Sequence, residues 1–510
     1  MNLDRTRNAT RNLIWGIMNK VIVLLLPFAN RTILVYVLGA SYLGLDSLFS
    51  AILQMLNIAE LGFSSAIVFA MYKPIAEENY TQINALLQFY KKIYRIIGII
   101  VFAIGILIVP MLPSLIKGDL PGDLNLYSLY GIYLLNTVLG YWLFSYKKSL
   151  ISAYQREDVI SNINSIIIIA KTILQVCVIY FLHRYYLYVL MLPVMTIVEN
   201  LIVSYLANRL FPMCVPQGTL EKGIIADIRK RVYGLMIQKI CSTSRNSLDS
   251  IVISTYAGLY NVSIYGNYYY IMIGIHTILG TITNSITAVV GNAVAVESVE
   301  KNHADMLKFN FIYMWLASLL TVYLLCIYQP FMQLWMGENM MLEMSVVAVI
   351  CAYFYSLCVG DIRYVYTIAT GLWYEGRYRA VLEALTNLVL NIVLGKYFGI
   401  MGVVVATLIS ILVINFGYGS TIIYTYYFKN KKLHVYYLYH LYFAVVTCIA
   451  GELCYRLCEF CKGQGIMKII ANIVICTVVS NGILFCAYCK LPVYKEAKDM
   501  CRNVLKRFCK

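Results

Sequence analysis

Four cationic side chains lie inside long apolar stretches of the sequence, where charge is costly. Lys20 and Arg31 occur in the first stretch, and Lys239 and Arg245 occur in a matching stretch that begins near Tyr233. A cation in the core of a lipid bilayer costs at least about 2.5–3.5 kcal/mol on insertion scales. Because Lys and Arg combine charge with several hydrogen-bond donors, cations that line a water-filled cavity would suit a ligand that carries phosphate.

Polar residues recur at helical spacing in the same stretches. In the second stretch they follow one another at steps of three or four residues, which places them on one face of a helix. These residues are Asp46, Ser50, Gln54, Asn57, Glu60 and Ser64. The seventh stretch repeats the pattern with Gln238, Ser242, Arg245 and Asp249. The eighth offers His276 at the position equivalent to Asn57.

Two interpretations of these stripes stay open. Polar side chains either join neighbouring helices by hydrogen bonds or line a cavity. Arg245 and Asp249 are four residues apart and can pair with each other, so this couple is the most easily explained as structural. The acidic residues and His276 are candidates for binding a coupling proton or sodium ion. Lys171, Glu199, Asp361, Arg363 and Glu383 fall near the ends of apolar stretches, where side chains can reach the interface, and are given no role.

The composition places these residues in a polytopic membrane protein. Of the 510 residues, 61% are hydrophobic and only 13% are charged. Apolar runs long enough to cross a bilayer predict an all-α integral membrane protein with about fourteen transmembrane helices. They are expected near residues 13–38, 42–71, 93–112, 124–146, 159–182, 186–208, 233–257, 262–296, 309–329, 341–369, 380–397, 399–427, 435–457 and 466–489.

The distribution of Lys and Arg predicts the orientation. Most of the 41 Lys and Arg residues fall on the side of the N-terminus, and the opposite loops hold few. This asymmetry predicts a multi-pass protein with both termini in the cytoplasm. The net charge of +16 is then a consequence of topology, and nucleic-acid binding is not expected. The first stretch is too long for a cleavable signal peptide and is expected to remain as a helix.

The cysteines do not indicate a metal site. Two pairs have CxxC spacing, Cys458 with Cys461 and Cys486 with Cys489. The predicted topology puts the two pairs on opposite sides of the membrane, so they cannot form one four-thiolate site. We therefore expect most of the fifteen cysteines to be small apolar fillers and predict no metal.

An internal repeat organises the chain. One constant register places Lys20 on Lys239 and Gly39 on Gly258. Six spans separate the equivalent elements, so both copies enter the membrane from the same side, and a substrate site is expected between the two lobes. The predicted segments are an N-lobe (1–210), a cytoplasmic linker (211–232), a C-lobe (233–430), two further helices (431–490) and a basic cytoplasmic tail (491–510).

Several kinds of chemistry have no support in the sequence. No GxxxxGK[ST] motif occurs, so the chain does not bind ATP through a P-loop. The outer loops are short and contain no cluster of acids or His, which a membrane glycosyltransferase or glycan polymerase would need. No catalytic residues are therefore predicted.

Three segments carry a family resemblance. Residues 38–44 (LGASYLG), 60–66 (ELGFSSA) with 72–74 (YKP), and 152–156 (SAYQR) resemble the polysaccharide repeat-unit flippases of the Wzx type. These belong to the multidrug/oligosaccharidyl-lipid/polysaccharide (MOP) exporter superfamily, which also holds the MATE transporters and the lipid II flippase. The resemblance covers roughly residues 5–430. The two additional C-terminal spans resemble the arrangement of the lipid II flippase.

The resemblance implies a fold and a cargo. It implies two parallel six-helix lobes around a central cavity that alternates between the two faces of the bacterial cytoplasmic membrane. The cargo would be an oligosaccharide on undecaprenyl diphosphate, used for capsule, O-antigen or a related polymer, and the partners would be membrane lipids and the polysaccharide polymerase machinery. Cations on the first and seventh helices are a recurrent theme of these flippases. Here the matching residues are Lys20, Arg31, Lys239 and Arg245.

Two other functions stay open. A cation-coupled multidrug exporter of the MATE type would share the fold, but its cationic cargo would prefer an acidic cavity. A membrane glycan polymerase or transferase would need the missing catalytic loop. No cofactor is expected beyond a coupling ion, H⁺ or Na⁺.

Overall fold

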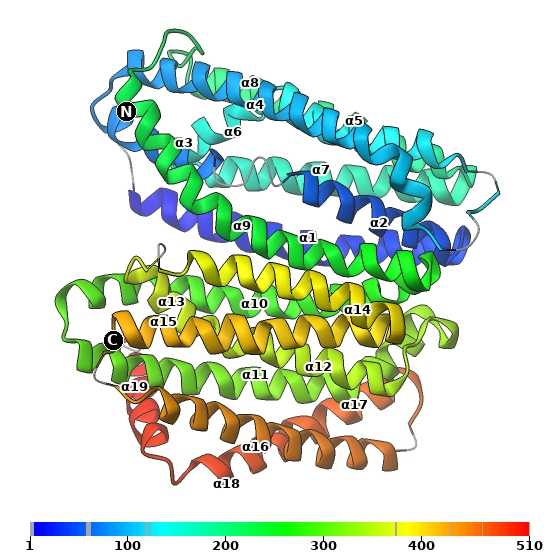
Figure 1. The fold of residues 1–510 in the computed structure, drawn as a ribbon, viewed down its shortest axis with the longest axis vertical. Helices are drawn as coiled ribbons and strands as arrows, with labels where there is room; N and C mark the ends of the chain where they lie inside the picture. Colours follow the sequence, from blue (N-terminus) through cyan, green and yellow to red (C-terminus); the bar gives the residue numbers. More distant parts are fainter. Residues whose placement is uncertain are drawn as a thin grey trace. The chain divides into compact units, whose positions relative to one another are not determined.

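The computed structural model describes residues 5–57, 63–117, 120–122, 124–372, 375–429, 431–461 and 463–508, and within them it contains helices and no strand. The chain divides into two compact units, Met1–Ser263 and Ile264–Lys510. They are called unit 1 and unit 2 below. In each unit the long helices lie roughly side by side (Figure 1). The predicted all-α class is confirmed.

Unit 1 contains nine α-helices in its described residues. They are α1 (Arg5–Val37), α2 (Ala40–Leu56), α3 (Phe63–Ala76), α4 (Tyr80–Ile108) with the 3₁₀-helix η2 (Val109–Leu115), α5 (Leu126–Trp142), α6 (Tyr146–Ala153), α7 (Glu157–Cys177) with the π-helical turn η3 (Val178–Leu182), α8 (Tyr185–Leu210) and α9 (Lys222–Ala257). Helix α1 packs along α7, α5 along α8, and α9 along α2.

Helix α10 (Leu259–Val296) leads into unit 2. The elements that follow are α11 (Val299–Met336), η4 (Glu338–Met340), α12 (Met344–Val359), α13 (Asp361–Ala369), α14 (Arg377–Ser410), the π-helical η5 (Ile411–Tyr418), α15 (Gly419–Tyr426), α16 (Leu433–Phe460), α17 (Gly465–Ile475), the π-helical η6 (Cys476–Ser480), α18 (Asn481–Tyr488) and α19 (Pro492–Phe508). Helix α11 contacts α12, α16 and α17.

Helices occupy the predicted spans, but the span predicted at 42–71 falls on two helices, α2 and α3, and the span predicted at 341–369 falls on α12 and α13. Nine helical segments among the described residues are long and apolar enough to cross a membrane, and three shorter apolar helices occur in residues 21–76. One of the nine, Arg377–Tyr426, contains the two spans predicted at 380–397 and 399–427. The helix is interrupted at Gly399, whose φ of 56° and ψ of −130° are not helical. Only glycine adopts this conformation readily, which explains why the chain turns there.

Local signals define where several helices begin. The side chains of Asn79 and Asn125 accept hydrogen bonds of 3.0 Å from backbone N–H groups three residues later, and Ser298 does the same at 3.3 Å. These side chains satisfy donors that the first turn of a helix leaves without partners. Gly39 and Gly258, equivalent in the repeat, both separate two helices and both have positive φ, 114° and 87°. The same backbone break thus occurs in both copies of the repeat.

Polar contacts attach the C-terminal helices to α11. Thr447 of α16 donates to Ser318 at 2.8 Å, and Asn472 of α17 donates to the carbonyl of Cys326 at 2.9 Å. In an apolar environment such bonds hold helices together where burial of apolar surface contributes little. The last two spans therefore belong to the packed body of unit 2.

Helix α9 lies in unit 1, where it contacts α2, α3 and η2. The proposed lobes at 1–210 and 233–430, with the linker between them, stay a prediction.

Candidate functional site

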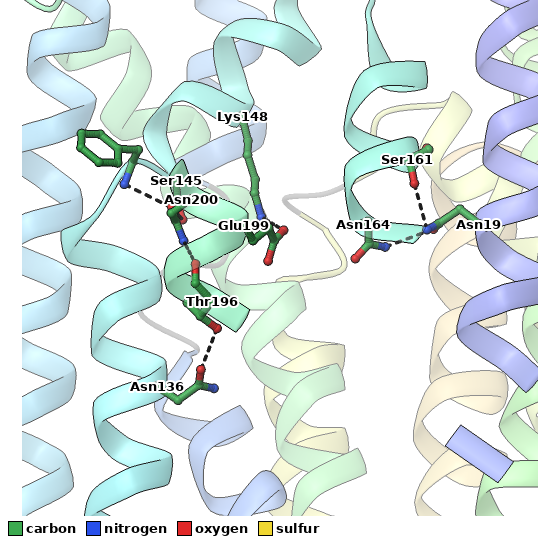
Figure 2. A network of polar contacts seen from close by, with 10 residues as sticks. Asn19, Asn136, Ser145, Lys148, Ser161, Asn164, Thr196, Glu199 and Asn200 are labelled. Atoms are coloured by element: carbon green, nitrogen blue, oxygen red, sulfur yellow. Dashed lines mark hydrogen bonds and ion pairs between the residues drawn. The ribbon is translucent and has the colours of Figure 1, made fainter. Parts of the chain in front are cut away.

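The first helix uses its polar face to pack against α7. The side-chain amide of Asn19 donates to the carbonyl of Ser161 at 3.3 Å, and Asn164 donates to Asn19 at 3.2 Å (Figure 2). Three turns later Asn30 donates to Gln175 at 2.9 Å. These two asparagines of the first stretch therefore join two helices.

Arg31 belongs to a second polar group, centred on Asp46 of α2. The hydroxyl of Tyr133, on α5, donates to Asp46 Oδ1. Arg31 and Lys171, from α1 and α7, are both within electrostatic reach of the Asp46 carboxylate. Three helices thus bring two cations and one carboxylate into the same part of unit 1.

Tyrosines enclose this charged group. The hydroxyls of Tyr133 and Tyr185 lie 3.4 Å apart, and the Tyr185 hydroxyl donates to the backbone carbonyl of Tyr42 at 3.2 Å. The ring of Tyr185 also stacks on that of Tyr188, with centroids 5.7 Å apart. Because aromatic rings exclude water, they strengthen the electrostatic interactions of the charges beside them.

The rest of the α2 stripe contacts neighbouring helices. Asn57 accepts a hydrogen bond of 2.8 Å from the hydroxyl of Tyr141 on α5. Gln54 accepts one of 3.2 Å from Ser247 on α9. Asp249 is 1% exposed. The structure thus places Asp46, Gln54 and Asn57 on one helix whose polar face meets both α5 and α9.

A further polar network joins α5, α6 and α8. Lys148 and Glu199 form an ion pair of 2.5 Å, and Thr196 donates to Asn136 at 2.7 Å (Figure 2). Lys147 is 8% exposed, and its ammonium donates to two oxygen atoms of α8, the hydroxyl of Ser204 and the side-chain carbonyl of Asn208. The sequence had offered no reason to group these residues, because their helices meet only in the fold.

In unit 2 the predicted polar residue His276 has an acidic partner. Its Nε2 lies 3.1 Å from Oδ2 of Asp361, the first residue of α13. The hydroxyl of Tyr313, on α11, donates to the same oxygen at 2.5 Å. The repeat pairs His276 with Asn57. Asn57 bonds to α5, the fourth predicted span of the first half, and His276 bonds to α13, which belongs to the fourth predicted span of the second half.

Four of the predicted site residues lie outside what the structure describes. Glu60 falls in the gap between α2 and α3, and the side chains of Lys20, Lys239 and Arg245 are not among the described ones. Their roles stay predictions. Of the four proposed cavity cations, Arg31 alone has a described side chain.

Unit 1 also contains an apolar cavity of about 800 Å³. Its walls come from α2, α3, α4, η2 and α9 and consist mainly of isoleucine side chains, among them Ile52, Ile100, Ile108 and Ile251. A cavity of this size and composition suits part of a long hydrocarbon chain.

Comparison with known proteins gives the fold. No protein-family profile and no curated protein matches the sequence. Among solved structures, the lipid II flippase MurJ in an inward closed conformation superposes with a TM-score of 0.69, over 94% of this chain and 99% of that chain, at 14% identity. The chain has the fold of the MOP-superfamily transporters.

Other MOP structures agree. A multidrug-resistance MATE transporter in its inward-facing conformation matches with a TM-score of 0.62 at 15% identity, over 78% of this chain and 93% of that one. A MOP transporter from Pyrococcus furiosus, described as having a binding pocket of reversed polarity, matches with a TM-score of 0.56 at 14% identity, over 81% of this chain and 95% of that one. The coverage is thus broader for the flippase than for these two. The resemblance predicted the superfamily fold correctly, and the Wzx-type assignment stays a proposal.

Proposed function

We propose that the protein is a flippase that moves a lipid-linked oligosaccharide, of the undecaprenyl-diphosphate kind, across the bacterial cytoplasmic membrane by alternating access. The observation that carries the proposal is the group formed by Arg31, Lys171 and Asp46 in unit 1. Lys171 also lies near Glu199, which pairs with Lys148, so the described charges of this partly buried, tyrosine-lined region are three cations and two carboxylates, with an excess of one positive charge. Such a region attracts an anion.

The charge of this region separates the proposal from its main rival. A diphosphate linked to a lipid and a sugar carries negative charge, and Lys and Arg supply both charge and hydrogen-bond donors for it. A cationic drug would be repelled by the same region. The electrostatics therefore favour the flippase over the MATE-type exporter.

The apolar cavity of unit 1 supports a lipid cargo. Its isoleucine walls offer hydrocarbon contacts to a prenyl tail, while the polar face of α2 offers amide groups to hydrated sugars. A cargo with both parts matches a unit that contains both kinds of surface.

Release of the cargo needs a change in the charged group. A proton or Na⁺ bound at Asp46 would cancel the negative charge that attracts Arg31 and Lys171 and would alter their contact with the diphosphate. Asp46 is thus our first candidate for ion coupling among the described residues of unit 1, and the further candidates are Asp249 and His276.

Charge reversal tests the proposal. A strain that lacks the chain should accumulate lipid-linked repeat units on the cytoplasmic leaflet, and the wild-type gene should relieve this. We expect Arg31→Glu to fail to relieve it although the protein inserts. The matched control is Arg456→Glu, because the side chain of Arg456 is 70% exposed and pairs locally with Glu452.

Two outcomes would contradict the proposal. One is full export by the Arg31→Glu protein. The other is unchanged amounts and sidedness of lipid-linked intermediates in the deletion strain. Increased sensitivity of that strain to cationic drugs, with normal export, would instead support the MATE-type function.

A further inference from the structure

His276 and Asp361 of unit 2 share their site with a buried thiol. The Sγ of Cys358, a ring nitrogen of His276 and a carboxylate oxygen of Asp361 all lie within 4.8 Å of one another. Cys358 and Asp361 come from the consecutive helices α12 and α13, and His276 comes from α10, which is distant from them in sequence. We infer that His276, Cys358 and Asp361 form a binding site for a zinc-class divalent ion. This goes beyond the proposed function and does not depend on it.

The donor set suits such an ion. Imidazole nitrogen, thiolate sulfur and carboxylate oxygen are the three kinds of ligand that zinc takes in proteins. Bond lengths of about 2.0–2.3 Å place tetrahedral ligands about 3.3–3.6 Å from one another. The separation of 3.1 Å between His276 Nε2 and Asp361 Oδ2 is already close to this. From a separation of at most 4.8 Å, the thiol needs to approach by no more than about 1.2–1.5 Å, which a change of side-chain rotamer can provide.

Charge balance favours the site as well. A divalent cation with one thiolate, one carboxylate and one neutral imidazole has no net charge. Because net charge is costly inside a membrane protein, a neutral complex is the form that the surroundings tolerate best.

A neighbouring tyrosine contacts two of the three proposed ligands. The Tyr313 hydroxyl donates to Asp361 and also interacts with the Cys358 thiol. Hydrogen bonds of this kind orient metal ligands and hold them in place. The side chain of Tyr313 is buried, so its hydroxyl is fixed before an ion arrives.

The site also has an entrance and an open position. Cys358 is fully buried, whereas the His276 and Asp361 side chains are 23% and 24% exposed. The open side of the site therefore lies at these two residues. Three protein ligands leave the fourth tetrahedral position for water.

A second thiol cluster in unit 2 provides a contrast. Cys326, Cys458 and Cys476 also bring their sulfur atoms within 4.8 Å of one another, but all three are buried and apolar side chains surround them. Three thiolates around a divalent ion would leave a net negative charge in these surroundings. We therefore assign these thiols to packing, and they serve as the internal control.

Ion binding would release a proton. The ion gives up three of its bound water molecules to solvent, and the thiol proton of Cys358 passes to solvent as well. The His276 ring moves its single proton from Nε2, which faces the Asp361 carboxylate, to Nδ1, so that Nε2 can bind the ion. One Zn–S, one Zn–N and one Zn–O bond form, and no oxidant or reductant is involved. Calorimetry in buffers of different ionisation enthalpy should thus show release of about one proton for each ion bound.

Metal analysis of the purified full chain tests the inference. After treatment with chelator, incubation with Zn²⁺ and desalting, we expect about one zinc per chain. Cys358→Ser and Asp361→Asn should each weaken binding by about 100-fold or more, and Tyr313→Phe by about 10-fold to 100-fold. Cys458→Ser should bind as the wild type does. Co²⁺ in place of zinc should give the visible spectrum of a tetrahedral thiolate site, lost in Cys358→Ser.

The results that would overturn the inference are specific. Monodisperse wild-type protein that binds no zinc refutes it, and so does zinc binding that is lost in Cys458→Ser and retained in Cys358→Ser. If Cys358→Ser fails to fold, the Asp361→Asn protein and the Co²⁺ spectrum of the wild type decide. A Co²⁺ spectrum without thiolate character would also refute the site.

Discussion

Gly44 of α2 allows a very close backbone approach to the start of α10. A Cβ atom at this position would lie 2.0 Å from the carbonyl oxygen and 2.6 Å from the carbonyl carbon of Leu259. Ordinary contacts begin at 3.4 Å, so a Gly44→Ala protein must move the two backbones apart until the new methyl group reaches that separation. Because backbone atoms form both sides of the contact, a side-chain rotation cannot relieve it.

The expected cost follows from packing. Overpacking a well-packed interior costs about 1–3 kcal/mol, and this overlap is at the upper end of that range. Alanine regains about 1 kcal/mol over glycine as a helix former. The net loss of about 2 kcal/mol corresponds to a decrease in Tm of about 4–8 °C for a unit of this size.

The assay is thermal unfolding of the detergent-solubilised protein, followed by loss of the monodisperse peak in size-exclusion chromatography. The matched control is Gly131→Ala in α5, where a Cβ atom would meet nothing within 4 Å. This control should unfold at the wild-type temperature or above it. An unchanged Tm for Gly44→Ala, or an equal decrease for Gly131→Ala, would refute the reasoning.

Three further predictions concern the thiols and one ion pair. Burial raises the pKa of the Cys214 thiol, so peptide mass spectrometry should find this residue slower to react with a maleimide at neutral pH than Cys461; equal rates would contradict the burial. A membrane-impermeant maleimide should label Cys461 in intact cells and Cys489 only after permeabilisation, and the reverse order would invert the predicted topology. Removing one partner of the Lys148–Glu199 pair should lower the free energy of unfolding by about 1 kcal/mol. The double variant Lys148→Met with Glu199→Gln should lose less free energy of unfolding than the sum of the two single losses. Strict additivity would show that the pair does not interact.

The spans could be predicted because a bilayer requires long apolar runs with all backbone groups bonded internally. Even the turn between the eleventh and twelfth spans was predicted closely, since Gly399 is where the structure departs from helical geometry. The repeat was predicted from weak identities, and it pairs Gly39 with Gly258, which both have positive φ.

The partners of the charged residues could not be predicted in the same way. Lys171 and Asp361 lie near the ends of apolar runs, where the sequence predicts no role for them. The role of such a residue depends on which helices pack against its own helix. The spacing of residues within one helix gives no information about this packing. Lys171 approaches Asp46 because α7 and α2 lie in one unit, and Asp361 of α13 contacts His276 of α10, which is distant in sequence.

The two halves of the predicted repeat thus share a backbone break at Gly39 and Gly258 but differ in the polar residues at equivalent positions. The register that pairs Gly39 with Gly258 places Tyr265 where unit 1 has Asp46, and Tyr265 is 1% exposed and stacks on Tyr269. Conversely, the neutral contact of Asn57 corresponds to the ionisable pair of His276 and Asp361. Among the described residues, the position equivalent to Asp46 is thus a tyrosine, and the position equivalent to His276 is an asparagine. Because the second half has no carboxylate at the position equivalent to Asp46, we expect that neutralising Asp46 is not compensated there.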